Sequence, residues 1–285
     1  MFARKSARNL EIVHVDGGIL TLESFGTGPT TLFVHGLGEG RYVWRHLLCH
    51  PDFKGRQVSY DLRGHGDSSW NPQGDYTIEQ HVDDLQKVLH SLPNERVIIV
   101  GHSMGGEIAL RASGRNLSKV CGLILVDCSL SHAPEVLQRL KREQSEVDAG
   151  FSDASQFRNW LSWNRPLIRA SLVDQVVNSA LTLENNGLFM LRRDPRLLSA
   201  RVSELNYTDH NLNALDKLRH PLLLLRGAAS SFLSVATAQA MIARAKCAEM
   251  CTVPSSGHGI ALENPEGLIF AITPFLSSHL FDIEL

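Results

Sequence analysis

One short segment constrains the fold more than any other: an apolar run that leads into a turn rich in glycine. Residues 97–100 read Val-Ile-Ile-Val, a strand of the kind that is buried on both faces of a sheet. Gly101-His102-Ser103-Met104-Gly105 follows directly, and a helical pattern continues to Arg115. A serine at such a turn has a strained backbone and needs neighbours without side chains. The segment therefore predicts a strand, a sharp turn that lifts the Ser103 hydroxyl above the sheet, and a helix whose first amides face a developing anion.

The rest of the chain repeats this alternation of short strands and longer helices. The patterns predict strands at 10–15, 19–25, 31–35, 56–61, 96–101, 123–126, 222–225 and 249–253, and helices at 77–92, 105–115 and 265–280. Repeated strand–helix units with buried strands favour a mostly parallel sheet that is covered by helices on both sides. We therefore predict an α/β fold.

Residues 129–218 break the alternation, because they are mostly helical, carry many charges and contain no convincing strand. We predict an α/β core from residues 1–128 and 219–285, with residues 129–218 inserted as a helical cap. Insertions at the carboxyl edge of a parallel sheet lie over the binding crevice. The aromatic side chains of this insertion either line a pocket or only pack the cap onto the core; they include Phe157, Trp160, Trp163 and Phe189.

With these segments assembled, the sequence resembles the α/β-hydrolase superfamily over nearly its whole length. The resemblance rests on the Ser103 turn and on three further segments: 32–38 (LFVHGLG), 60–68 (YDLRGHGDS) and 256–266 (SGHGIALENPE). It points to the serine-nucleophile branch with a helical cap, a group that includes esterases, enol-lactone hydrolases and meta-cleavage-product hydrolases. A serine at position 103 excludes the haloalkane dehalogenases and epoxide hydrolases, which carry aspartate there.

The resemblance also implies roles for individual residues. Ser103 is the expected nucleophile, and His258, in its glycine-flanked loop, is the expected general base. The backbone N–H groups of Leu37 and Met104 are the expected oxyanion hole. The remaining pocket candidates flank this site as wall and support residues: His35, Gly36 and His102.

The acidic residue that would complete a triad with Ser103 and His258 is not at the position where the family usually has it. Counting back from His258, the usual acid position is Ser230, and residues 226–233 contain no carboxylate. Asp127 is the best replacement, because it ends the strand at 123–126 and both strand ends border the histidine loop in this fold. Some family members place the acid there. A triad that lacks an acid, or that uses Glu263 or Asp209, is the open alternative.

The amino-acid composition limits the kinds of partner that the protein is expected to bind. The chain has 28 Lys and Arg against 30 Asp and Glu, so its formal net charge of −2 gives no electrostatic footprint for nucleic acid or an acidic membrane. The five cysteines form no CxxC pair, which is typical of reduced thiols. No apolar run approaches the roughly 20 residues that span a bilayer, and the basic N-terminus lacks a secretory apolar region. We expect a soluble cytoplasmic protein.

The sequence shows no metal-binding or dinucleotide-binding motif, so we expect no metal and no cofactor. The expected reaction is cleavage of a carboxylic ester, lactone or related acyl bond of a small, largely apolar substrate through an acyl-enzyme. Two alternatives stay open. One is a cofactor-independent oxygenase similar to the quinolone 2,4-dioxygenases, in which the His–Asp pair acts as the base. The other is a non-catalytic small-ligand binder. The oligomeric state is not readable from the sequence.

Overall fold

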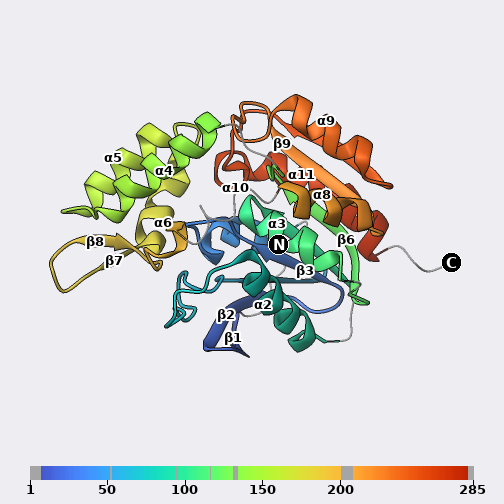
Figure 1. Ribbon diagram of the computed structural model, residues 1–285, viewed down its shortest axis with the longest axis horizontal. Coiled ribbons are helices and arrows are strands. Elements are labelled where there is room, and N and C mark those ends of the chain that lie inside the picture. The colour runs from blue at the N-terminus through green and yellow to red at the C-terminus, as the bar shows by residue number, and fades with distance from the viewer. Residues whose placement is uncertain are drawn as a thin grey trace.

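A twisted sheet forms the centre of the computed structural model, which describes residues 8–51, 53–93, 96–115, 117–130, 134–199 and 208–281. Over this part of the chain the sheet has eight strands in the order β1-β2-β4-β3-β5-β6-β9-β10 (Figure 1). The strands are β1 (Asn9–Val15), β2 (Gly18–Phe25), β3 (Thr30–Val34), β4 (Arg56–Tyr60), β5 (Val97–His102), β6 (Val120–Val126), β9 (Leu222–Gly227) and β10 (Ala248–Val253). Only the pairs β1–β2 and β2–β4 are antiparallel, so the prediction of a mostly parallel sheet is confirmed.

Helices cover both faces of the sheet. On one face lie α2 (Ile78–Ser91), α3 (Met104–Ser113), α8 (Thr208–Lys217) and α9 (Val235–Arg244); on the other lie η1 (Arg41–Trp44), α1 (Arg45–Leu48), α10 (Ile260–Glu263), α11 (Pro265–Leu276) and the π-helical turn η2 (Ser277–Phe281). In β5, Val97 and Ile99 pack with the first group, whereas Ile98 and Val100 pack with the second. Both faces of β5 are therefore buried, as its apolar sequence predicts.

Capping residues set where two of these helices begin. The Thr77 side chain accepts a hydrogen bond from Gln80 N at 3.3 Å and so starts α2, one residue after the start of the predicted helix at 77–92. Asn264 caps α11, which has Pro265 in its first turn. The sequence patterns did not indicate α9, nor the short helices η1, α1 and α10.

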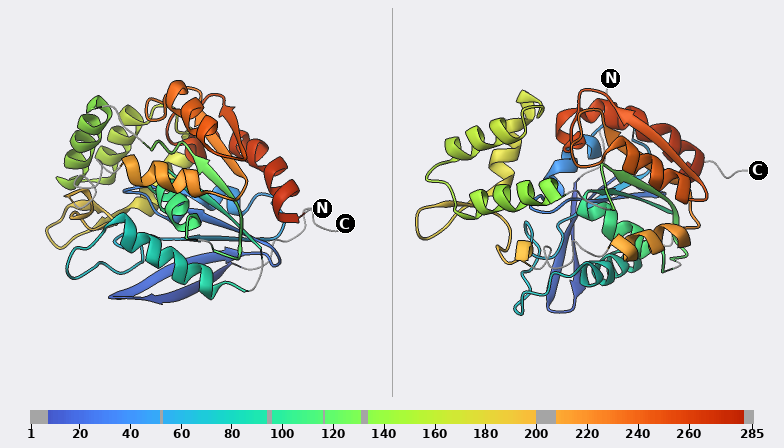
Figure 2. Two further views of the ribbon diagram at one scale, coloured as in Figure 1. Left: turned by 45° about the vertical axis from the view of Figure 1, so that its right-hand side comes forward. Right: turned by 45° about the horizontal axis from the view of Figure 1, so that its top comes forward.

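Residues 134–191 form a separate group of elements on one side of the molecule (Figures 1 and 2). They are α4 (Pro134–Asp148), α5 (Ala154–Asn164), α6 (Ala170–Ala180) and the hairpin of β7 (Leu181–Leu183) and β8 (Phe189–Leu191), which together we call the cap segment. The hairpin corrects the prediction of an insertion without strands, because three-residue strands are too short to show an alternating pattern.

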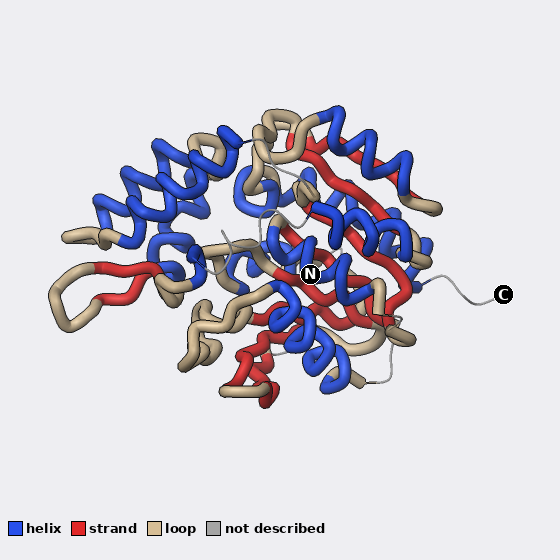
Figure 3. Tube along the Cα trace, in the orientation of Figure 1, coloured by secondary structure: helices blue, strands red, loops and turns tan. Residues whose placement is uncertain are grey.

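The last helix of the insertion lies apart from the cap segment. Helix α8 packs against α3 and α9, beside the sheet (Figure 3). The division into a core of residues 1–128 and 219–285 and a cap of residues 129–218 remains our proposal.

The turn between β5 and α3 has the close backbone packing that its glycines predict. Ser103 has φ 51° and ψ −120°, a positive φ that side chains rarely adopt. A Cβ at Gly101 would lie 2.5 Å from the carbonyl oxygen of Gly105, and one at Gly105 would lie 2.4 Å from that of Val34. The strand, the turn and the helix therefore meet with no room for a methyl group.

Replacing Gly101 with alanine is expected to lower the free energy of unfolding by about 2 kcal/mol or more, because backbone must move to admit the methyl group. Urea denaturation measures the change. The matched control is Gly114→Ala at the far end of α3, where the nearest atom to an added Cβ is 3.4 Å away. Equal stability of the two variants would show that the turn is not packed as described.

Candidate active site

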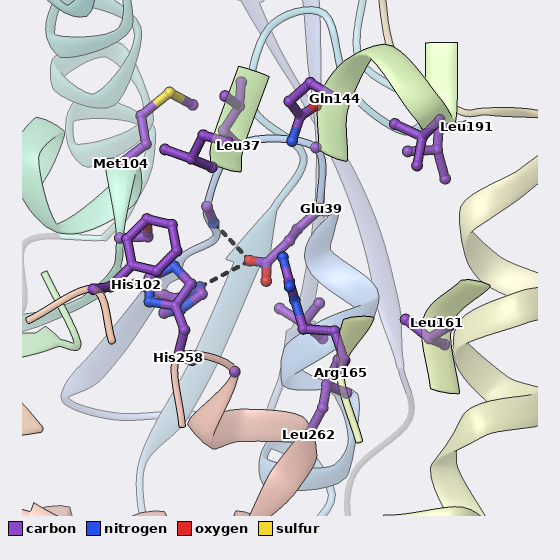
Figure 4. A pocket seen from close by; sticks show the side chains of 18 of the residues that line it. Leu37, Glu39, His102, Met104, Gln144, Leu161, Arg165, Leu191, His258 and Leu262 are labelled. Carbon is purple, nitrogen blue, oxygen red and sulfur yellow. Dashed lines mark hydrogen bonds and ion pairs between the residues drawn. The ribbon is translucent and has the colours of Figure 1, made fainter. Parts of the chain in front are cut away.

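A cavity of about 150 Å³ lies between the cap segment and the carboxyl edge of the sheet (Figure 4). Ser103 and His258 both line it. Most of its wall is apolar, with side chains from the loop after β3, from α3, from α4 and α5, and from the loop after β9; these include Leu37, Met104, Leu140, Phe157, Trp160, Leu161 and Phe232. The cavity can therefore hold a small, largely apolar molecule against the Ser103 hydroxyl.

The histidine and the aspartate singled out by sequence lie in direct contact. His258 Nδ1 is 2.8 Å from Asp127 Oδ2. Asp127 directly follows β6 and is 1% exposed. Its carboxylate also accepts a hydrogen bond from Gly227 N at 3.1 Å and one from the Ser230 hydroxyl at 2.6 Å. A buried carboxylate with three donors can fix the ring orientation of His258 and stabilise its protonated form.

Ser230 shows why the usual acid position can lack a carboxylate. Its hydroxyl donates its one proton to Asp127 Oδ2, and its oxygen accepts from the backbone N–H groups of Phe232 and Leu233, both at 3.1 Å. Because β6 and β9 are neighbours in the sheet, their carboxyl ends reach the same histidine. The two positions form one polar unit in which Asp127 holds the negative charge and Ser230 supplies a donor.

His258 lies in an environment that favours its neutral form. Burial lowers the pKa of His258, the hydrogen bond with Asp127 raises it, and the charge of His102 lowers it again, so that the net direction is downward. The ring of Phe232 stacks on the imidazole at 3.9 Å between centroids. A lowered pKa favours the unprotonated ring, which is the state in which an imidazole can accept a proton.

The two other acid candidates are placed differently. Glu263 Oε2 accepts a hydrogen bond from Gly257 N at 2.5 Å, so this carboxylate holds the backbone of the histidine loop. Burial raises the pKa of Glu263. The side chain of Asp209 lies outside the part of the chain whose side chains the structure describes.

The residues that carry the expected oxyanion donors, Leu37 and Met104, both border the cavity. Met104 is the first residue of α3, where backbone N–H groups have no acceptor within the helix. Leu37 lies in the loop after β3 and also lines the cavity. This arrangement is compatible with two N–H groups that converge on an oxygen beside Ser103.

Four of the seven pocket-wall candidates from sequence line the cavity: Gly36, His102, Phe157 and Trp160. Trp163 does not, because this side chain, near the end of α5, is 86% exposed to solvent. Phe189, in β8, forms a backbone bridge with Phe151, which precedes α5, and lies outside the cavity wall.

His35 also lies behind the wall. It is fully buried, with Nδ1 2.8 Å from Gly36 O and Nε2 accepting from Leu62 N at 2.9 Å. Its role is to hold two loops together. The sequence patterns also missed wall residues that the structure reveals, among them Glu39, Gln144, Leu161 and Arg165. Of these residues, only Glu39 could have been suspected from the sequence, because it directly follows segment 32–38, which resembles the family.

Fold and site together define the class of protein. The profile of the alpha/beta hydrolase family matches residues 31–271, and the chain belongs to this family. Among curated relatives it is 26% identical to 2-(acetamidomethylene)succinate hydrolase of Mesorhizobium japonicum, over 93% of this chain and 94% of that protein. It is 27% identical to an esterase of Mycobacterium tuberculosis, over 92% of this chain and 88% of that protein.

A solved structure shows the same fold. The crystal structure of E-2-(acetamidomethylene)succinate hydrolase superimposes with a TM-score of 0.87 at 22% identity, covering 95% of this chain and all of that one. The two curated relatives are hydrolases, which supports hydrolase activity for this chain. Across the described ranges, no helix is long and apolar enough to cross a membrane, and no group of three or more His, Cys, Asp or Glu side chains could hold a metal ion.

Proposed function

We propose that this protein is a serine hydrolase that cleaves a carboxylic ester, lactone or related acyl bond through an acyl-enzyme. The observation that carries the proposal is the pairing of His258 with the buried Asp127, beside a cavity that Ser103 also lines. The backbone strain at Ser103 supports it, because a positive φ at this turn serves to expose the hydroxyl.

In the first half of the reaction, His258 Nε2 accepts the Ser103 proton while Oγ attacks the acyl carbon. Asp127 stabilises the imidazolium that forms, through its hydrogen bond to Nδ1. The N–H groups of Leu37 and Met104 stabilise the negative oxygen, at about 3 kcal/mol for each donor. The imidazolium then gives its proton to the leaving group, and the acyl group stays on Ser103.

In the second half, His258 takes a proton from water, which attacks the acyl-enzyme, and then returns that proton to Ser103 Oγ. Each group ends in its starting state. The cavity wall, with Phe157 and Leu161 from α5, favours an apolar acyl or leaving group of small size.

The test is intact-mass analysis after treatment with a fluorophosphonate, a probe that reacts with an activated serine. The wild-type protein is expected to take one adduct and Ser103→Ala none. If folded wild-type protein takes no adduct even with a smaller probe, Ser103 is not an activated nucleophile. Oxygen uptake with a hydroxyquinolone and ligand binding without turnover are then the measurements that separate the oxygenase from the binder.

Two tryptophans of one helix provide a matched test of the pocket. Trp160 lines the cavity and stacks on Phe157 at 6.0 Å between ring centroids, whereas Trp163 points to solvent. Trp160→Ala is expected to reduce the preference for longer acyl chains about tenfold in kcat/KM, because apolar contact is lost. A series of p-nitrophenyl esters measures this preference. Trp163→Ala is the control, and an equal effect of both variants would place the acyl group elsewhere.

A further inference from the structure

A second histidine–carboxylate pair lies beside the catalytic residues and has no role in the reaction described above. His102 precedes Ser103, and its side chain is 5% exposed. Its Nδ1 is 2.9 Å from Glu39 Oε2, and its Nε2 is 2.9 Å from the backbone oxygen of His258 (Figure 4 draws the contact with Glu39). One imidazole thus joins the turn of the nucleophile to two other loops.

The partners of His102 fix its protonation by hydrogen-bond chemistry. A backbone oxygen can only accept, so Nε2 must carry a proton. Glu39 Oε2 also accepts a hydrogen bond from Gly36 N at 2.8 Å, and the pKa of Glu39 is held at about 2, so this carboxylate is ionised and can only accept. Nδ1 must then carry a proton as well. With a proton on each nitrogen, His102 is an imidazolium paired with a carboxylate.

We propose that Glu39 and a protonated His102 form a positioning pair that fastens the oxyanion loop (residues 35–39) and the base loop (residues 256–259) to the nucleophile turn. This inference rests on the proposed function, because it assigns the pair to the same site. The pair acts through its neighbours: Gly36 precedes the expected oxyanion donor Leu37, and the oxygen held by Nε2 belongs to His258 itself.

The charges around the pair keep it ionised. Burial works to raise the pKa of Glu39, but His102 and the Gly36 N–H outweigh it and hold the pKa at about 2. Burial works to lower the pKa of His102, but Glu39 and the carbonyl of His258 outweigh it, and the pKa is raised. The other titratable groups that face His102 are Asp127 after β6, His35 after β3, His258 in the base loop and Glu263 at the end of α10.

The pair also affects the base by its charge. The rings of His102 and His258 are 4.7 Å apart between centroids, and Glu39 bonds to the nitrogen of His102 that does not face His258. The positive charge of His102 thus adjoins the His258 ring, and it lowers the pKa of His258. A nearby positive charge disfavours a second imidazolium, so the pair helps to keep His258 neutral. Two neutral side chains in these places would hold the loops without this effect.

The direct test needs no substrate. In protein labelled with ¹⁵N-histidine, NMR at pH 8 is expected to show one histidine with protons on both ring nitrogens. This signal should be missing in His102→Asn and should become that of a neutral imidazole in Glu39→Gln, since an uncharged amide does not hold the second proton. A wild-type spectrum in which every histidine is neutral at pH 8 would overturn the inference, whatever the protein hydrolyses.

The kinetic test separates a positioning pair from a merely structural contact. Glu39→Gln is expected to lower kcat roughly 100-fold, because the reacting groups lose their alignment. It should also move the acidic limb of the kcat/KM profile to higher pH, since His258 loses the positive charge that lowers its pKa. Lower stability and activity without a shift of this limb would show a structural contact only.

The chain offers a matched control for this variant. Glu266 pairs with His46 at 3.5 Å and with Arg169, on a surface where both side chains of the His–Glu pair are partly exposed. Glu266→Gln is expected to leave kcat and the pH profile unchanged. Loss of activity in the control equal to that in Glu39→Gln would overturn the assignment of a special role to the pair at Glu39.

Discussion

Replacing Ser103 with alanine is expected to lower kcat about a million-fold, the largest effect of any single substitution in this protein. The variant keeps the cavity, the base and the oxyanion donors but has no oxygen that can form the acyl-enzyme. What remains, about 10³-fold to 10⁴-fold over water, comes from binding and from oxyanion stabilisation alone. The measurement is kcat with a p-nitrophenyl ester, together with the pre-steady-state burst, which should vanish.

The matched control is a serine on the helix that Ser103 caps. Ser113 lies at the other end of α3, where its hydroxyl donates to Ala109 O at 2.8 Å. Ser113→Ala removes the same atom from the same helix and is expected to retain full kcat. If Ser103→Ala kept even about one hundredth of the wild-type activity, this would be well above the residual activity that we expect. The nucleophile would then have to be another group.

Asp127→Asn is expected to lower kcat about 10⁴-fold while the fold stays intact. An asparagine fits the same space, but its amide can face His258 Nδ1 in two ways. Either its NH₂ group donates to Nδ1, or its uncharged oxygen accepts from Nδ1. In the first case the proton moves to Nε2, which can no longer accept from Ser103. In the second case the imidazolium forms without a counter-charge. Steady-state kinetics measure the loss, and far-ultraviolet circular dichroism checks the fold.

Two further variants identify the acid. Ser230→Ala removes one of the three donors to the Asp127 carboxylate and leaves its charge, so its effect should be far smaller than that of Asp127→Asn. Glu263→Gln tests the alternative acid and keeps an acceptor for the Gly257 N–H. Activity close to that of the wild type in Asp127→Asn, with a large loss in Glu263→Gln, would transfer the role to Glu263.

Most of the fold could be predicted from the sequence, because strands, turns and helices are indicated by residues that lie close together in the chain. The strand and turn around Ser103 could be recognised from a few adjacent residues, and the predicted sheet strands match observed ones closely. The proximity of Asp127 and His258, 131 positions apart, followed from one topological fact: neighbouring parallel strands end at the same edge. The short hairpin of the cap segment gave no signal, since three residues do not establish a period.

The details of the site could not be predicted, because they depend on how separate elements face one another. Trp160 and Trp163 have the same chemistry and lie on one helix, yet only the packing of α5 decides that one lines the cavity. The contact of His102 with Glu39 joins positions 63 apart, on loops that no pattern relates. Its protonation follows only when both of its hydrogen-bond partners, Glu39 and the backbone oxygen of His258, are known.

The anchoring of Asp127 has a consequence for how such a protein can diversify. Asp127 is the residue from which the chain leaves the sheet toward the cap segment, but its own N–H and carboxylate bond to Leu225, Gly227 and Ser230 on and beyond β9. The Asp127 carboxylate is thus held by β9 and the residues after it, and not by the cap segment that follows it in the chain. Helices can be swapped or lengthened over the cavity to suit another substrate while the reactive centre keeps its alignment.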